Sequence, residues 1–157
     1  MRAKIVLASA VVFLASAALS SAADPQMGTW KLNEGKSKLN PSATKNLTVA
    51  YTAAGDSVKV TVDGVDKDGK PAHSEWTGKF DGKDYAVTGD PTADMRSYKK
   101  IDERTLEIIN KKAGAVTSSG RIAVSADGKS RTLSIAATDA SGQKISPPGV
   151  YDQQYSR

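Results

Sequence analysis

The sequence predicts an all-β protein, and three observations lead to this prediction. Apolar residues alternate with polar ones in short runs, as Val58, Val60 and Val62 do with the residues between them. Asp-Gly and Ala-Gly pairs separate these runs, and no segment has a convincing helical period. Alternation with a period of two, broken by turn residues, is typical of half-buried antiparallel strands. We therefore expect an antiparallel up-and-down meander of about eight to ten short strands closed into a small barrel, because closure removes exposed strand edges.

The predicted strands follow one another along the chain and end at turn residues. Their alternating residues are Leu47, Val49 and Tyr51; Val58, Val60 and Val62; Trp76, Gly78 and Phe80; Leu106 and Ile108; Ile122 and Val124; and Leu133, Ile135 and Ala137. The turns include Asp68-Gly69, Asp81-Gly82 and Asp127-Gly128, since Gly accepts the positive φ of tight hairpins. Residues 33–44 connect the first two strands, and Glu34 to Lys38 is expected to form one helical turn there.

The N-terminal 23 residues have the order of a secretory signal peptide. Arg2 and Lys4 precede an uncharged apolar run from Ile5 to Leu19, and small residues follow at 20–23. The run is shorter than the roughly 20 apolar residues of a membrane span, so a cleaved signal is favoured over an anchor. We therefore expect residues 1–23 to be removed and residues 24–157 to form a single barrel domain. The mature chain should be exported, to a periplasm or the extracellular space, with no transmembrane span.

Composition argues against several classes of function. The chain has no Cys and one His, so disulfides, thiolate metal sites and Cys nucleophiles are excluded. Its net charge of +5 is spread along the sequence, whereas nucleic-acid binding normally needs a clustered basic surface. Asp66, Asp68 and Glu75 fit part of a calcium-loop pattern, but Gly64 occupies the first ligand position. We expect no metal, no cofactor, no nucleic-acid partner and no enzymatic activity.

The opening Gly28-Thr29-Trp30 resembles the Gly-x-Trp motif of the lipocalins, in which the Trp closes one barrel end. Residues 28–155 also resemble small secreted bacterial lipocalin-like (calycin-type) proteins of largely unassigned function. The matching segments are Gly-Thr-Trp-Lys-Leu-Asn with Lys36-Ser37-Lys38, Val62-Asp63-Gly64, Phe80-Asp81-Gly82-Lys83-Asp84-Tyr85 and Val150-Tyr151-Asp152. The chain departs from true lipocalins in lacking a disulfide and a C-terminal helix. Its 33–44 connection is too short for the two-helix lid of fatty-acid-binding proteins.

Five residues are the candidate ligand-binding site of such a barrel. Trp76, Phe80 and Tyr85 are expected to form an aromatic core cluster that would also line a ligand cavity. Arg96 and Tyr98 lie on one strand face and resemble the carboxylate-binding Arg-x-Tyr of fatty-acid-binding proteins. For Arg96 an outward orientation is favoured, with an anchoring role inside the barrel as the alternative.

These observations favour an exported, non-enzymatic binding protein that holds an apolar or amphipathic small molecule. On this hypothesis, Trp76→Ala should weaken ligand binding without unfolding the chain, whereas Trp30→Ala should mainly destabilise the fold. The alternative is a filled barrel that acts through its loops, particularly 33–44 and 139–149, as an envelope protein-interaction or inhibitor module. A protein partner, and the identity of a hydrophobic ligand, do not follow from the sequence.

Overall fold

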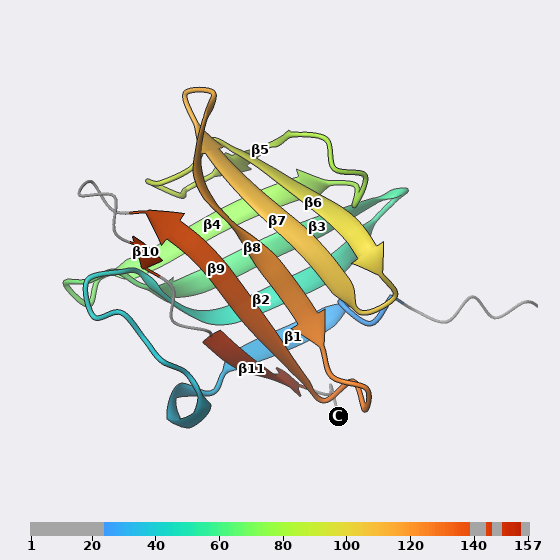
Figure 1. The fold of residues 1–157 in the computed structure, drawn as a ribbon, viewed down its shortest axis with the longest axis horizontal. Coiled ribbons are helices and arrows are strands. Elements are labelled where there is room, and N and C mark those ends of the chain that lie inside the picture. The colour runs from blue at the N-terminus through green and yellow to red at the C-terminus, as the bar shows by residue number, and fades with distance from the viewer. Residues whose placement is uncertain (1–23, 139–143, 146–148, 155–157) are drawn as a thin grey trace, which may run out of the picture.

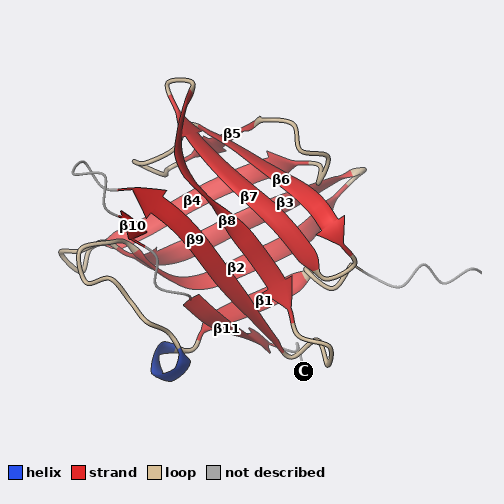
Figure 2. Ribbon diagram, in the orientation of Figure 1, coloured by secondary structure: helices blue, strands red, loops and turns tan. Residues whose placement is uncertain are grey.

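Antiparallel strands account for most of the computed structural model, which describes residues 24–138, 144–145 and 149–154 (Figures 1 and 2). The elements are β1 (Gly28–Leu32), the 3₁₀-helix η1 (Glu34–Lys36), β2 (Lys45–Ala54), β3 (Ser57–Val65), β4 (Pro71–Gly78), β5 (Tyr85–Thr88), β6 (Met95–Asp102), β7 (Thr105–Lys112), β8 (Ala115–Val124), β9 (Ser130–Thr138), β10 (Lys144–Ile145) and β11 (Gly149–Gln154). The predicted signal peptide and most of the 139–149 loop lie outside the described residues.

The sheet closes on itself, as predicted. Each strand from β1 to β9 is hydrogen-bonded to the next one along the chain. β11 then pairs with both β9 and β1, which completes the ring. The two-residue β10 pairs with the same strand β9, so the other ten strands form the barrel wall. All pairings are antiparallel, and the architecture is a closed all-β meander.

Strand burial follows the alternation seen in the sequence. In β7, Leu106, Ile108 and Asn110 are buried inside the barrel and the residues between them are more exposed. The next hairpin turns at Ala113 and Gly114, which have φ angles of 49° and 82°. Two consecutive positive φ angles match the tight turns whose twist suits antiparallel strands.

One end of the barrel is covered by the segment that precedes β1. Trp30 is fully buried, and its Nε1 donates a 2.9 Å hydrogen bond to the carbonyl oxygen of Gln26. The side chain of Gln26 donates in turn to the carbonyl oxygen of Arg104, at 3.1 Å. These contacts confirm that Trp30 closes a barrel end with its indole N–H satisfied. We call this the covered end.

The opposite end, which we call the mouth, carries the 33–44 connection. The expected helical turn is η1, where the Asn33 side chain accepts a hydrogen bond from the backbone N–H of Lys36. The Ser37 hydroxyl attaches the connection to the barrel by donating to the carbonyl oxygen of Val150 and accepting from its N–H. In Figure 1 this segment lies on the same side as the β3–β4 hairpin and β10. Within the described residues, no helix is long and apolar enough to cross a membrane.

Candidate ligand site inside the barrel

The predicted aromatic residues meet inside the barrel. The Trp76 ring centroid lies 4.7 Å from that of Tyr98 and 5.6 Å from that of Tyr85, both edge to face. Phe80 is stacked on Trp76 at 6.5 Å, and Tyr51 meets Tyr98 at 6.3 Å. The prediction of an aromatic core cluster is therefore confirmed.

This cluster is densely packed. Trp76 is 1% exposed, and its Nε1 donates to the carbonyl oxygen of Arg96 at 2.9 Å. The Tyr85 ring packs directly on Gly78 and leaves no room for a side chain there, since a Cβ at Gly78 would lie 2.5 Å from Tyr85 Cγ. Neither of the two cavities described below is lined by Trp76, Phe80, Tyr85, Arg96 or Tyr98. Their role as ligand-lining residues stays a prediction.

Arg96 points into the barrel, so the favoured outward orientation was wrong. It is 7% exposed, and its Nη2 forms a 2.9 Å ion pair with Asp90 Oδ2. Its Nε donates to Asn110 Oδ1, and Asn110 Nδ2 donates to the hydroxyl of Ser118. Arg96 lies on the same face of its strand as the buried Tyr98, and this face points into the barrel. Burial of the Arg96 charge is tolerated because Asp90 supplies a counter-charge.

The buried phenol of Tyr98 is held in its neutral form. Burial raises the pKa of Tyr98, and the neighbouring Tyr51 raises it further. The positive charges of Arg96 and Arg131 oppose this effect but do not overcome it. Tyr98 therefore stays a hydrogen-bond donor over the physiological pH range.

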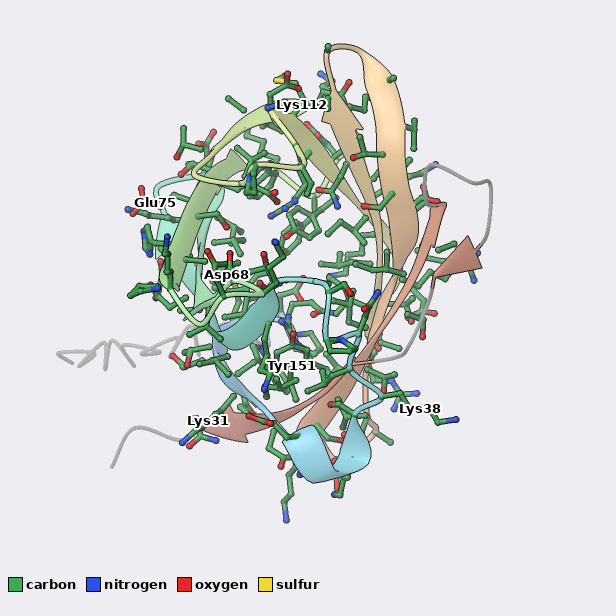
Figure 3. All side chains as sticks on the ribbon, turned by 90° about the vertical axis from the view of Figure 1, so that its left-hand side faces the viewer. Lys31, Lys38, Asp68, Glu75, Lys112 and Tyr151 are labelled. Atoms are coloured by element: carbon green, nitrogen blue, oxygen red, sulfur yellow. The ribbon has the colours of Figure 1, made fainter. Side chains whose placement is uncertain are left out.

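A cavity of about 260 Å³ lies at the mouth, beneath the 33–44 connection. Its lining residues are Leu32, Lys38, Leu39, Asn40, Ala43, Thr44, Lys45, Asn46, Leu133, Ile135, Gly149 and Tyr151. Figure 3 looks into this end, with Tyr151 inside the barrel and Lys38 at its outer edge. This volume is slightly below the range of small-molecule pockets, about 300–1,000 Å³.

The cavity is amphipathic. Leu32, Leu133 and Tyr151 form an apolar wall contributed by β1, β9 and β11. Lys38 comes from the 33–44 connection that covers the cavity, and Lys45 is the first residue of β2 and forms a 3.2 Å ion pair with Glu34. Such a site suits a ligand with an apolar body and a polar group.

Arg131 is a second charged residue inside the barrel, and the sequence reasoning missed it. It is 2% exposed, and its guanidinium carbon lies 5.2, 4.9 and 5.1 Å from the ring centroids of Trp30, Tyr51 and Tyr151. Stacking on aromatic faces is worth about 0.5–2 kcal/mol per contact. Nevertheless, Nε and Nη1 of Arg131 are buried and have no hydrogen-bond partner among the described residues.

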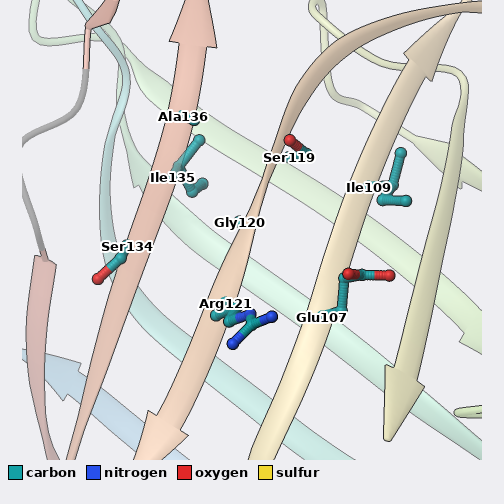
Figure 4. A pocket seen from close by; sticks show the side chains of 8 residues that line it. All are labelled: Glu107, Ile109, Ser119, Gly120, Arg121, Ser134, Ile135 and Ala136. Atoms are coloured by element: carbon teal, nitrogen blue, oxygen red, sulfur yellow. The ribbon is translucent and has the colours of Figure 1, made fainter. Parts of the chain in front are cut away.

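A shallower hollow of about 480 Å³ lies on the outer face of β7, β8 and β9 (Figure 4). In the register of these strands, Ile109, Ser119 and Ala136 form one row and Glu107, Arg121 and Ser134 form the next. Ile135 lines both this hollow and the mouth cavity.

The remaining charged clusters are on the outer surface. His73 Nδ1 lies 2.6 Å from Asp63 Oδ1, and its Nε2 lies 3.3 Å from Glu75 Oε1. These hydrogen bonds, first to Asp63 and then to Glu75, raise the pKa of His73. The residues of the incomplete calcium pattern form a hairpin in which Asp66 Oδ1 accepts from the N–H groups of Asp68 and Lys70. Among the described residues, no group of His, Cys, Asp and Glu is arranged to hold a metal ion.

No protein-family model matches the chain, and the comparison with curated proteins found no match. Among solved structures, the chain is similar to a redesigned β-barrel, with 12% identity and a TM-score of 0.44 over 83% of this chain and 93% of that chain. It is also similar to EF1p2_mFAP2b bound to DFHBI, with 12% identity and a TM-score of 0.46 over 83% of this chain and 94% of that chain.

Proposed function

We propose that the chain is an exported, non-enzymatic binding protein that holds an apolar or amphipathic small molecule. The observation that carries this proposal is the amphipathic cavity at the mouth, between the apolar wall and the 33–44 connection. On this view the barrel has two parts: an aromatic half that stabilises the fold and a mouth that receives the ligand. The opening Gly28-Thr29-Trp30, with Trp30 at the covered end, agrees with a lipocalin-like protein.

The test is a binding titration followed by tryptophan fluorescence, with fatty acids, retinoids and isoprenoids as probes. Native mass spectrometry of protein purified from its own source without detergent would detect a retained ligand. The informative variant is Leu39→Asp, because Leu39 lines the cavity and is partly exposed, so the fold should tolerate the change. A charge in an apolar lining should weaken binding by about tenfold or more.

Val116→Asp is the matched control. Val116 is an exposed residue of β8 and does not line the mouth cavity, so this variant should bind like the original protein. If Leu39→Asp and Val116→Asp bind every ligand equally well, the ligand does not occupy the mouth. If no probe binds and no mass is retained, the carrier proposal fails.

A second candidate function is that of a filled barrel that acts on a protein partner through its loops. The dense packing around Trp76 favours it, since that half of the interior has no room for cargo. Under this alternative, changes in the 33–44 connection would impair partner binding while the mouth cavity stays empty in every ligand titration.

A further inference from the structure

We propose that Arg131 is the anchor for a carboxylate, so that the ligand of the mouth is a small anionic amphiphile bound with its head group inward. This inference rests on the proposed function and specifies the ligand class. In β9, the side chains of Ile135, Leu133 and Arg131 occupy successive inward positions. The first two line the cavity, and Arg131 lies one position deeper.

Tyr151 connects the cavity with the guanidinium. It lines the mouth cavity and also forms one side of the aromatic box around Arg131, at 5.1 Å. In the strand register, Tyr151 is paired directly with Arg131, and Gly149 with Leu133. Gly149 leaves space beside the Tyr151 ring, because a Cβ at Gly149 would lie 3.2 Å from Tyr151 Cε2. The Tyr151 ring therefore lies between the mouth cavity and Arg131, and the proposed binding mode requires this ring to move.

The two interior arginines differ in the partners that they have. Arg96 is neutralised by Asp90 at 2.9 Å and hydrogen-bonded to Asn110. Arg131 has aromatic neighbours, and Nε and Nη1 have no acceptor among the described residues. Each of these two nitrogens shares an edge of the guanidinium with Nη2, and a carboxylate can bind either edge through two parallel hydrogen bonds. A carboxylate at this position would pair with a buried charge already held in place by aromatic rings.

In the opposite orientation, the ligand would place its head group beside Lys38 and Lys45 at the rim of the mouth and its tail inward. The inward head group is favoured because Arg131 is already desolvated and forms no ion pair among the described residues, whereas Lys45 is paired with Glu34. The two orientations predict different sensitive residues.

The experiment compares decanoate with 1-decanol, which has the same chain length without the charge, by isothermal titration and by tryptophan fluorescence. We expect the original protein to bind decanoate about 10- to 100-fold more tightly than 1-decanol, in keeping with charged hydrogen bonds. Arg131→Met keeps the apolar stem and should remove this preference. The double variant Lys38→Met/Lys45→Met should keep it.

Each result has a defined meaning. If the original protein and Arg131→Met both bind decanoate and 1-decanol with equal affinity, Arg131 is not the anchor, but the proposed binding function stands. If the original protein binds neither ligand, the proposed binding function is overturned. Loss of the preference in the double lysine variant alone places the head group at the rim and also overturns the anchor. If Arg131→Met does not fold, Arg131→Lys replaces it: the anchor requires a weakened preference for decanoate, because an ammonium cannot make the paired hydrogen bonds.

Discussion

Replacing Trp76 with Ala should cost much of the stability of the fold. The side chain is buried among Tyr85, Phe80 and Tyr98, and removing a buried Trp costs about 3–5 kcal/mol. The carbonyl oxygen of Arg96 would also lose its indole donor, which adds about 1 kcal/mol. The sum, about 4–6 kcal/mol, is a large share of the 5–15 kcal/mol that stabilises a typical domain.

The assay is urea unfolding followed by far-ultraviolet circular dichroism, with the free energy of unfolding extrapolated to water. Trp76→Phe is the graded control, because it keeps an aromatic ring and should lose mainly the hydrogen bond to the Arg96 carbonyl, about 1 kcal/mol. Trp30→Ala should cost about as much as Trp76→Ala, since both indoles are buried and hydrogen-bonded. The dense packing around Trp76 is the reason for this expected loss of stability, and a separate effect of Trp76→Ala on ligand binding stays a prediction. A loss below about 1.5 kcal/mol for Trp76→Ala, with an unchanged urea dependence, would refute the packing argument.

Three further predictions follow from contacts described above. Asp90→Ala leaves the buried Arg96 charge unpaired and should cost about 3–5 kcal/mol in urea unfolding; Asp90→Ala combined with Arg96→Met should recover part of this loss. Gly78→Val should cost about 1–3 kcal/mol by displacing the Tyr85 ring, and an unchanged unfolding midpoint would contradict the close approach. The pKa of His73 is raised in the folded state, so its stabilisation is fully present below its ordinary pKa of about 6.5 and is lost as pH rises through the folded value. Stability measured against His73→Gln should therefore differ more at pH 5.5 than at pH 8.5, and a ring pKa at or below the ordinary value in an NMR titration would rule this out.

Strand alternation was sufficient to predict the barrel, because burial on one strand face leaves a period of two in the sequence. It also placed Trp76, Phe80 and Tyr85 together, since their parity and the 81–83 turn fix them on one side. The connection between β5 and β6 at residues 89–94 was less predictable, because neither Gly89 nor Asp90 interrupts an obvious alternating run.

Charged residues inside the barrel were the hardest to place. Arg131 continues the alternation of Leu133 and Ile135, and this parity was the signal that could have found it. Its charge argued for the surface, and the rings of Trp30, Tyr51 and Tyr151, from β1, β2 and β11, make its burial tolerable. The cavity at the mouth depends on how the 33–44 connection folds over the barrel, which strand periodicity does not determine. Long-range packing of this kind leaves no local pattern in the sequence.

The wall of the barrel has a narrow seam at β5. This strand has four residues and is joined by two register pairs to β4 and by two to β6, whereas the β2–β3 hairpin has nine. In a closed sheet, local unfolding begins at the strand with the fewest pairings, and the longer hairpins stay intact during such an opening. The amide protons of β5 should therefore exchange with solvent by local unfolding, at a higher rate than the amide protons of β7 and β8. Because Trp76 and Tyr85 flank this seam, water would reach the aromatic interior there before it enters through either end of the barrel.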